Sequence, residues 1–324
     1  ETAAVFAVAF LFLIAIRAVD PAVHPGGGEK FLDFGLLRSL LRAETLPPED
    51  MWFAGEPVKY YYGGHLLASL LTRLTGTAPR FAYNLALAGF YAMLVTAAYG
   101  VAGSLAASRG SPRVLGGLFG AFFVGIASNL HTPGKFVLWL LPEGIAGVVA
   151  GLFSIELSGV ATGPSNFGYW PASRVIDGTI NEFPLFAWLN GDLHAHMMST
   201  PFLLLVAALC YSYWRTPETE RMRRRLRLAA VVPVAGLLAI VNTWSFPTAG
   251  GLVLLIVAFA PADPATLLPS PVAARLPTRS GLAEEFRRDG LALAVAVVAL
   301  LLAGLLVLPF WLGSASSRGV GPFP

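Results

Sequence analysis

The chain has 324 residues, of which 56% are hydrophobic and only 13% are charged, and its formal net charge is +3. Ordinary soluble domains contain about 45–50% apolar and about 25% charged residues, so this composition excludes a soluble globular domain. The single cysteine, Cys210, excludes an internal disulfide framework and a cysteine-based zinc site. Because the apolar residues come in long blocks separated by proline and glycine, we expect a polytopic membrane protein.

Seven apolar blocks are predicted to form membrane helices. They cover about residues 2–16, 81–107, 114–130, 201–214, 226–242, 247–260 and 291–312. Several are shorter than the roughly 20 residues that span a bilayer, but basic residues at their ends can extend them. We therefore expect an all-α, polytopic transmembrane bundle of about seven helices that forms a single integral-membrane domain over 1–324. The chain begins inside an apolar block and ends in a loop-like stretch, which favours a segment of a longer protein.

The distribution of arginine predicts the orientation in the membrane. Arginines gather in three connections, 108–113, 215–227 and 261–289, and the positive-inside rule places these in the cytoplasm. Two longer stretches, about 20–80 and 131–199, are poor in Lys and Arg, and the alternation of the blocks places both outside. All five histidines lie in or at the edge of these outer stretches. We therefore expect the functional loops on the extracytoplasmic side of a multi-pass cell-membrane protein.

The first outer stretch is predicted to contain interfacial helices. Apolar residues recur at helical spacing through EKFLDFGLLRSLLR, and a second amphipathic helix is expected to begin at His65. Asp33 lies inside the apolar part of the first helix, where a carboxylate is costly without a partner. The alternative is that Asp33 and Glu29 are solvated loop charges.

A run of three tyrosines precedes the second of these helices, and Gly63 and Gly64 separate it from His65. One interpretation is an aromatic belt at the level of the lipid headgroups. The other is substrate binding, because tyrosine hydroxyls and a histidine ring can hydrogen-bond to phosphate or to sugar hydroxyls. The two glycines permit a close backbone approach or a tight bend. The candidate binding residues here are Tyr60, Tyr61, Tyr62 and His65.

The second outer stretch carries the motif GDLHAH at 191–196. In an extended segment Asp192, His194 and His196 would point to one side, and in a helix Asp192 and His196 would be an i, i+4 pair. One carboxylate and two imidazoles fit a divalent-metal site, and they equally fit an acid–base and phosphate-binding group. The structural alternative is a hydrogen-bonded cluster that caps the following membrane helix.

Arg174 and Glu182 are further candidates in the same stretch. An arginine on the cation-poor side suits a phosphate, because its planar guanidinium can bind two oxygens at once. The alternative is a salt bridge from Arg174 to Asp177 or Glu182.

Six motifs occur in a fixed order: GEKFLDF, PPEDMWFAGEPVKYYYGGH, YNLAL, NEFPLFAWLNGDLHAHM, NTWSFP and LPFWLGSASSRGVG. Together they resemble the YYY-domain family of uncharacterised polytopic membrane proteins over nearly the whole chain. The chain departs from that pattern at Met51, where the family tends to have proline, and at Gly63, where it often has phenylalanine. The family is in turn similar to the GT-C superfamily of membrane glycosyltransferases. These enzymes use polyprenyl-phosphate sugars, and some need a divalent metal ion.

This resemblance implies a GT-C-like layout and a glycosyltransferase that takes a sugar from a polyprenyl-phosphate donor at the outer face of the membrane. GT-C enzymes carry an acidic catalytic residue in the first outer loop, the place that Asp33 occupies here with Glu29 nearby. The donor phosphate would meet cationic or hydrogen-bonding groups: Lys59, His65, Arg174, or a divalent metal ion at Asp192, His194 and His196. The implied partners are the lipid bilayer and the lipid-linked sugar.

Two other classes of protein stay open. A transporter or flippase of lipid-linked or polar substrates should carry ionisable residues at membrane depth, and the apolar blocks hold almost none. A non-catalytic envelope-assembly protein would not need Asp, His and Arg clustered beside the bilayer. Nucleic-acid binding is not expected, because the arginine run at 221–227 is short and flanks a membrane helix.

Overall fold

The computed structural model describes residues 1–24, 28–152, 168–276 and 280–315. These residues form helices and contain no β-strand, apart from one isolated bridge between Glu49 and Pro57. The first helices are α1 (Thr2–Val19), α2 (Lys30–Arg42), α3 (Gly63–Thr75), α4 (Pro79–Ser108), α5 (Arg113–Gly125), α6 (His131–Leu140) and α7 (Glu143–Leu152). The later ones are η2 (Trp170–Ser173), α9 (Phe186–Asn190), α10 (Ala195–Arg215), α11 (Arg221–Val241), α12 (Ser245–Phe259), η3 (Pro264–Leu267), α13 (Ser270–Ala273), α14 (Leu282–Leu306) and α15 (Leu308–Ala315).

Four of the described helices are long and apolar enough to cross a membrane: α1, α4, α10 and α14. The prediction of a helical membrane protein is confirmed, but the number of about seven spans is not. The predicted block at 114–130 ends as a helix at Gly125, and α5 and α12 are apolar but shorter than a span. Helix α11 has 21 residues, yet five arginines lie among its first seven, so its apolar part is short.

Helix α4 is the centre of the first half of the molecule and packs against α1, α5 and α10. Its contact with α5 is close because small residues face each other. A side chain at Gly116 or Gly120 of α5 would collide with Ala106 or Ala102 of α4. Small residues spaced four apart let membrane helices approach closely, since packing replaces the hydrophobic driving force in lipid.

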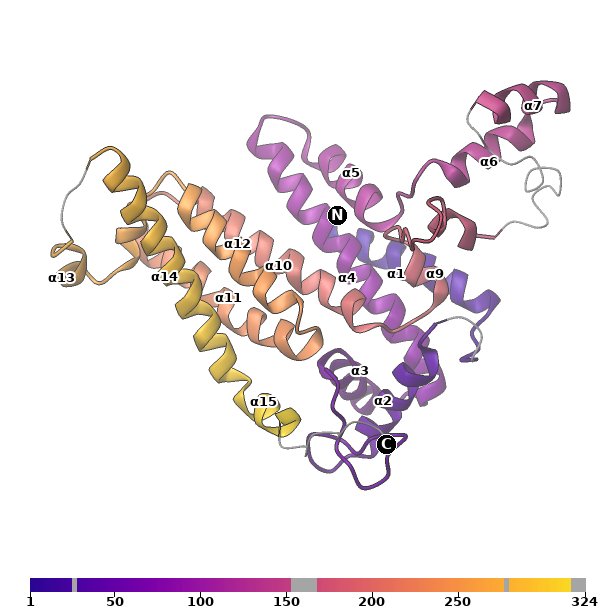
Figure 1. Ribbon diagram of the computed structural model, residues 1–324, viewed down its shortest axis with the longest axis horizontal. Coiled ribbons are helices and arrows are strands. Elements are labelled where there is room, and N and C mark those ends of the chain that lie inside the picture. The colour runs from indigo at the N-terminus through magenta and orange to yellow at the C-terminus, as the bar shows by residue number, and fades with distance from the viewer. Residues whose placement is uncertain (25–27, 153–167, 277–279, 316–324) are drawn as a thin grey trace.

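The second half is a bundle of α10, α11, α12 and α14, shown in the left half of Figure 1. Its core contains small residues such as Ala235, Ala249, Ala292 and Ala303, all buried. Helix α10 contacts α4 as well as this bundle and so joins the two halves. With 21 residues it is about 31 Å long, which matches the roughly 30 Å hydrocarbon core of a bilayer.

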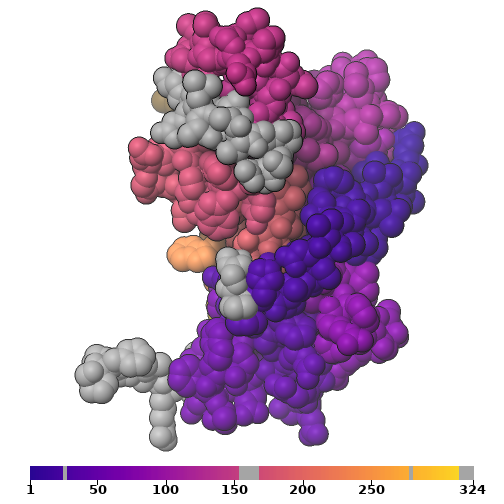
Figure 2. All heavy atoms as spheres, turned by 90° about the vertical axis from the view of Figure 1, so that its right-hand side faces the viewer, coloured from indigo at the N-terminus to yellow at the C-terminus, as the bar shows by residue number. Residues whose placement is uncertain are grey.

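The two helices predicted between residues 20 and 80 are present as α2 and α3, which pack against each other. Arg73 of α3 donates hydrogen bonds to the carbonyls of Leu40, Leu41 and Ala43, at distances of 2.9–3.1 Å. These are carbonyls that the end of α2 leaves without a helical partner, so Arg73 stabilises the terminus. Figure 2 shows this unit in purple at the bottom, α1 in indigo above it and the α6–α7 pair in magenta at the top.

Candidate functional site: a carboxylate and histidine cluster beside the helix bundle

Asp33 and His65 form a buried pair that joins α2 to α3. The His65 Nε2 atom lies 3.3 Å from Asp33 Oδ1, and their side chains are 0% and 2% exposed. Helical spacing places Asp33 on the buried face of α2 with Leu36, Leu37 and Leu40. The expectation that this carboxylate needs a partner is confirmed, and the alternative of a solvated loop charge is wrong for Asp33.

The two glycines before His65 hold α3 against the bundle. A Cβ atom at Gly63 would lie 2.8 Å from the backbone carbonyl of Ile240 in α11. A Cβ atom at Gly64 would lie 2.5 Å from the Met198 methyl group in α10. The glycines were predicted to permit either a close backbone approach or a tight bend, and the close approach is correct. It determines how near His65 lies to α10 and α11.

The three tyrosines divide between two environments. Tyr62 is only 6% exposed and packs in a small core, with its ring 5.4 Å from that of Phe310. Tyr60 and Tyr61 are half-buried, and their ring centroids lie 4.0 Å apart. Burial, the Tyr61 hydroxyl and the charges of Glu29 and Asp33 raise the pKa of Tyr60 well above its ordinary value. The Tyr60 hydroxyl is therefore neutral at physiological pH and interacts with the Tyr61 hydroxyl.

Asp192 lies where the two outer stretches meet. Asn190 Nδ2 donates to Asp192 Oδ2 at 2.6 Å, and the backbone N–H of Glu29 also donates to this carboxylate. Gly28 lies so close that any side chain there would collide with Asp192. Burial and the charge of Asp33 raise the pKa of Asp192, while Glu29 N–H, Asn190 and Lys30 oppose the shift. The two stretches thus form one cluster, although more than 150 residues separate Asp33 from Asp192 in sequence.

The two histidines of GDLHAH belong to the same cluster. His194 is extended and occupies the N-cap position of α10, but its side chain makes no capping hydrogen bond; α10 begins at Ala195, so His196 lies in its first turn. His194 Nε2 lies 3.0 Å from Glu29 Oε2, and its Nδ1 lies 2.7 Å from His196 Nδ1. Both ring nitrogens of His194 thus face protein groups, and Glu29 is about half exposed.

The predicted metal ligands do not gather around one point. In the described part of the chain, no group of three or more His, Cys, Asp or Glu side chains is arranged to hold a metal ion. Asp192 faces Asn190 and Glu29 N–H, and His194 faces Glu29 and His196. These residues therefore do not fit a three-ligand site, and a divalent metal stays a prediction from the sequence alone.

Two buried cations were missed by the sequence analysis. Arg17 at the end of α1 is 4% exposed, and its guanidinium donates to Asn84 at 2.8 Å and lies directly against Gly191. Lys30 is also 4% exposed, and burial and the charge of Arg17 lower its pKa, against the opposing charges of Asp192 and Asp20. The only signal in the sequence was an arginine at the end of an apolar block, which resembles a snorkelling residue.

Tyr83 of α4 binds the turn at Gly191–Leu193, which carries Asp192. Its hydroxyl donates to the Gly191 carbonyl and accepts from Leu193 N–H, both at 3.1 Å, and its ring is completely buried. The turn that carries Asp192 is thereby fastened to a central membrane helix. Tyr169 holds the same turn from the other side through a hydrogen bond to Asn190 at 3.2 Å.

Arg174, Glu182 and Lys59 are the other predicted binding residues, and in the described part of the chain neither Arg174 nor Glu182 forms a hydrogen bond or ion pair with the carboxylates or histidines of the cluster. Arg174 donates to Ser173 Oγ at 2.7 Å and lies over the Trp170 ring, and the described residues give it no ion pair with Asp177 or Glu182. Glu182 is exposed and lines a cavity of about 490 Å³ beside α9 and α10. Lys59 is exposed on the loop before the tyrosines.

An apolar cavity adjoins the Asp33–His65 pair. It has a volume of about 670 Å³ and lies between α1, α3, α4 and α10. On α3 it is lined from Leu67 onward, two residues after His65. Within the pair itself, Asp33 Oδ2 and His65 Nδ1 are buried without a hydrogen-bond partner, as is Asp192 Oδ1. These three atoms retain hydrogen-bonding capacity that a polar ligand or a water molecule could use.

Comparison with known families assigns the chain to a family of membrane proteins. A family model described as "Uncharacterized membrane protein (DUF2298)" matches residues 1–324. The chain belongs to this family. No curated protein and no solved structure matches the chain. Membership supports a membrane protein and leaves its activity open, so a functional conclusion depends on the chemistry of the cluster around Asp33 and Asp192.

Proposed function

We propose that the protein is a membrane glycosyltransferase that takes a sugar from a polyprenyl-phosphate donor at the outer face of the membrane. The observation that carries this proposal is the combination of two buried carboxylates, two buried cations and an adjoining apolar cavity. A lipid-linked sugar has parts that match these features. Its apolar chain suits the cavity, its phosphate suits the cations, and transfer of its sugar to a hydroxyl needs a carboxylate as base. The similarity of the YYY-domain family to the GT-C superfamily, and the place of Asp33 in the first long loop, support the same assignment.

The cavity between α1, α3, α4 and α10 suits the first isoprene units of the donor. Its lining includes Phe6, Phe10, Leu71, Leu85 and Phe90, which are apolar, and three of the four helices around it are long and apolar enough to cross a membrane. A prenyl chain bound here would place its phosphate at the end of the cavity near His65. Binding of an apolar chain in an apolar cavity is favoured by about 25 cal/mol for each Å² removed from water.

The phosphate would be stabilised by Arg17 and Lys30. Both side chains are buried beside Asp192, so their charges act through a medium that screens them less than water. An arginine can bind two phosphate oxygens at once. Tyr60, Tyr61 and Arg174 would then contribute hydrogen bonds to the sugar at the rim of the site, and this assignment is part of the proposal.

Asp33 would act as the general base. The acceptor hydroxyl gives its proton to the carboxylate and forms a bond to the anomeric carbon, while the bond from that carbon to the phosphate oxygen breaks and polyprenyl phosphate leaves. His65 Nε2 donates to Asp33 Oδ1, which leaves Oδ2 free to accept the proton. His65 is in this scheme a positioning residue, and Glu29 is a second carboxylate that holds His194.

The proposal is tested by incubating the purified full-length protein, reconstituted in liposomes, with synthetic polyprenyl-phosphate sugars and simple alcohol acceptors. Release of polyprenyl phosphate together with an alkyl glycoside is expected for at least one sugar. The Glu44→Gln variant is the matched control, because Glu44 is an exposed carboxylate just beyond α2. Tight donor binding with no release in the presence of acceptor would contradict transfer and favour a transporter of lipid-linked substrates.

A further inference from the structure

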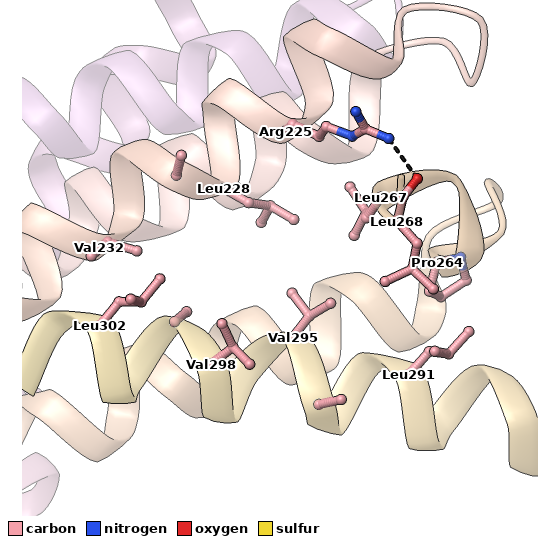
Figure 3. A pocket seen from close by; sticks show the side chains of 13 residues that line it. Arg225, Leu228, Val232, Pro264, Leu267, Leu268, Leu291, Val295, Val298 and Leu302 are labelled. Atoms are coloured by element: carbon pink, nitrogen blue, oxygen red, sulfur yellow. Dashed lines mark hydrogen bonds between the residues drawn. The ribbon is translucent and has the colours of Figure 1, made fainter. Parts of the chain in front are cut away.

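A third cavity lies at the arginine-rich end of the molecule, away from the carboxylate cluster. It has a volume of about 290 Å³ and is formed by α11, α14 and the short helix η3. Figure 3 shows Leu228 and Val232 of α11 facing Val295, Val298 and Leu302 of α14 across this groove. Val298 and Leu302 are about half exposed, so the groove is open on the side of these two residues.

The length of the groove corresponds to one leaflet of a membrane. Its lining on α14 extends from Leu291 to Leu302, which is about 16 Å at a rise of 1.5 Å per residue. Half of the roughly 30 Å hydrocarbon core is about 15 Å. An apolar groove of this length, open toward lipid on a spanning helix, suits a single acyl chain.

One end of the groove is positively charged. Arg225 lies there and donates to the Leu268 carbonyl at 2.6 Å, as Figure 3 shows, while its Nε atom is buried without a hydrogen-bond partner. Arg224 beside it donates to Thr266 Oγ1 and to the Tyr213 hydroxyl. The hydrogen-bond partners of both arginines among the described residues are neutral oxygens, so no carboxylate bonded to them cancels their charge.

Neighbouring arginines behave differently and provide a contrast. Arg223 lies on the same helix, is largely exposed and forms an ion pair with Glu220 at 2.8 Å. Arg287 of α14 forms ion pairs with Asp263 and Glu284. Arg224, Arg225 and Arg288 thus donate to neutral oxygens and not to a carboxylate, and of these three Arg225 lines the groove.

We propose that this groove binds one anionic phospholipid, with an acyl chain between α11 and α14 and the phosphate at Arg225. A zwitterionic lipid offers the same chain and phosphate, but the ammonium group of its headgroup would lie near the two arginines and oppose binding. An anionic lipid has no such group. The site is independent of the proposed glycosyl transfer, and by the positive-inside rule its lipid comes from the cytoplasmic leaflet.

The test is native mass spectrometry of the purified full-length protein in detergent, with phosphatidylglycerol or phosphatidylcholine of identical acyl chains added. We expect one phosphatidylglycerol molecule to be retained with about tenfold preference over phosphatidylcholine, because the choline cation would be repelled by the arginines. The Arg225→Gln variant should lose this preference. The Arg223→Gln variant, with the same change in net charge, should keep it.

A second variant separates the groove from the charge. Ala294→Trp places a large side chain in the groove lining and leaves Arg225 unchanged, so it should lower the retention of phosphatidylglycerol about tenfold as well. Equal retention of the two lipids by the wild-type protein would overturn the proposal. An equal loss of preference in Arg223→Gln and Arg225→Gln would also overturn it, because the preference would then reflect general surface charge.

Discussion

Replacing Gly63 by alanine tests how α3 is held against the bundle. The added Cβ atom would lie 2.6 Å from Ile240 Cγ1 and 2.8 Å from the Ile240 carbonyl carbon and oxygen. The Ile240 side chain can rotate, but the backbone of α11 cannot yield without moving the helix. His65 is two residues further along α3, so any shift that relieves this collision also disturbs its 3.3 Å contact with Asp33.

The size of the effect follows from two opposing contributions. Overpacking of a close contact costs about 1–3 kcal/mol, and replacement of glycine by alanine in a helix interior returns about 1 kcal/mol. Gly63 is the first residue of α3, so the helix-forming gain there is smaller than in an interior position. We expect the variant to be destabilised by about 1–2 kcal/mol.

The matched control is Gly100→Ala in the middle of α4. No atom outside the local helix lies within 4 Å of a Cβ atom at Gly100, so this variant should be stabilised by up to about 1 kcal/mol. The measurement is reversible unfolding in mixed micelles, followed by tryptophan fluorescence. Equal stabilisation of both variants would refute the inference that α3 touches the backbone of α11.

Three further predictions concern the cluster. His65→Ala should destabilise the protein by about 3–5 kcal/mol, because it leaves the Asp33 carboxylate buried without a partner. His24→Ala is the control and should not move the unfolding midpoint, since His24 pairs with Asp20 in solvent. Unchanged stability of His65→Ala would contradict the buried pair. The pKa of Asp192 is raised in the folded state, so at pH values just above 3.8 the folded protein binds more protons than the unfolded chain. The free energy of unfolding therefore falls as the pH rises from 3.8 through the raised pKa. Asp192→Asn should therefore lose less unfolding free energy than the wild type on going from acid to neutral pH, and parallel pH curves would refute this. If Arg17 and Lys30 stabilise the donor phosphate, EDTA should leave sugar release unchanged, and a loss restored by a divalent ion would instead support the metal prediction.

The period of apolar residues was sufficient to predict the helices α2 and α3. Leu36, Leu37 and Leu40 recur at helical spacing, so the predicted helix at 29–42 differs from α2 by one residue at its start. Periodicity assigns a buried face but gives no partner for a residue on that face. The pairing of Asp33 with His65, 32 residues away, therefore required the structure.

Other parts of the site could not be deduced for related reasons. GDLHAH was predicted to be either extended or helical. The helix begins inside the motif at Ala195, so His194 has an extended backbone and His196 a helical one. Arg17 resembled an arginine that reaches the membrane surface, and only the fold reveals Asn84 and Gly191 around its guanidinium. Short apolar helices such as α5 also cannot be told from spans by composition alone, because their ends depend on packing.

The measurement that tests the central claim most directly is the rate of sugar transfer by Asp33→Asn in the reconstituted full-length protein. Asparagine keeps the shape of the side chain and can still accept the hydrogen bond from His65 Nε2, but it cannot take a proton from the acceptor. The account predicts a decrease of about 10²–10⁴-fold with donor binding preserved, and an unchanged rate for Glu44→Gln. Transfer by Asp33→Asn at the wild-type rate would contradict the account.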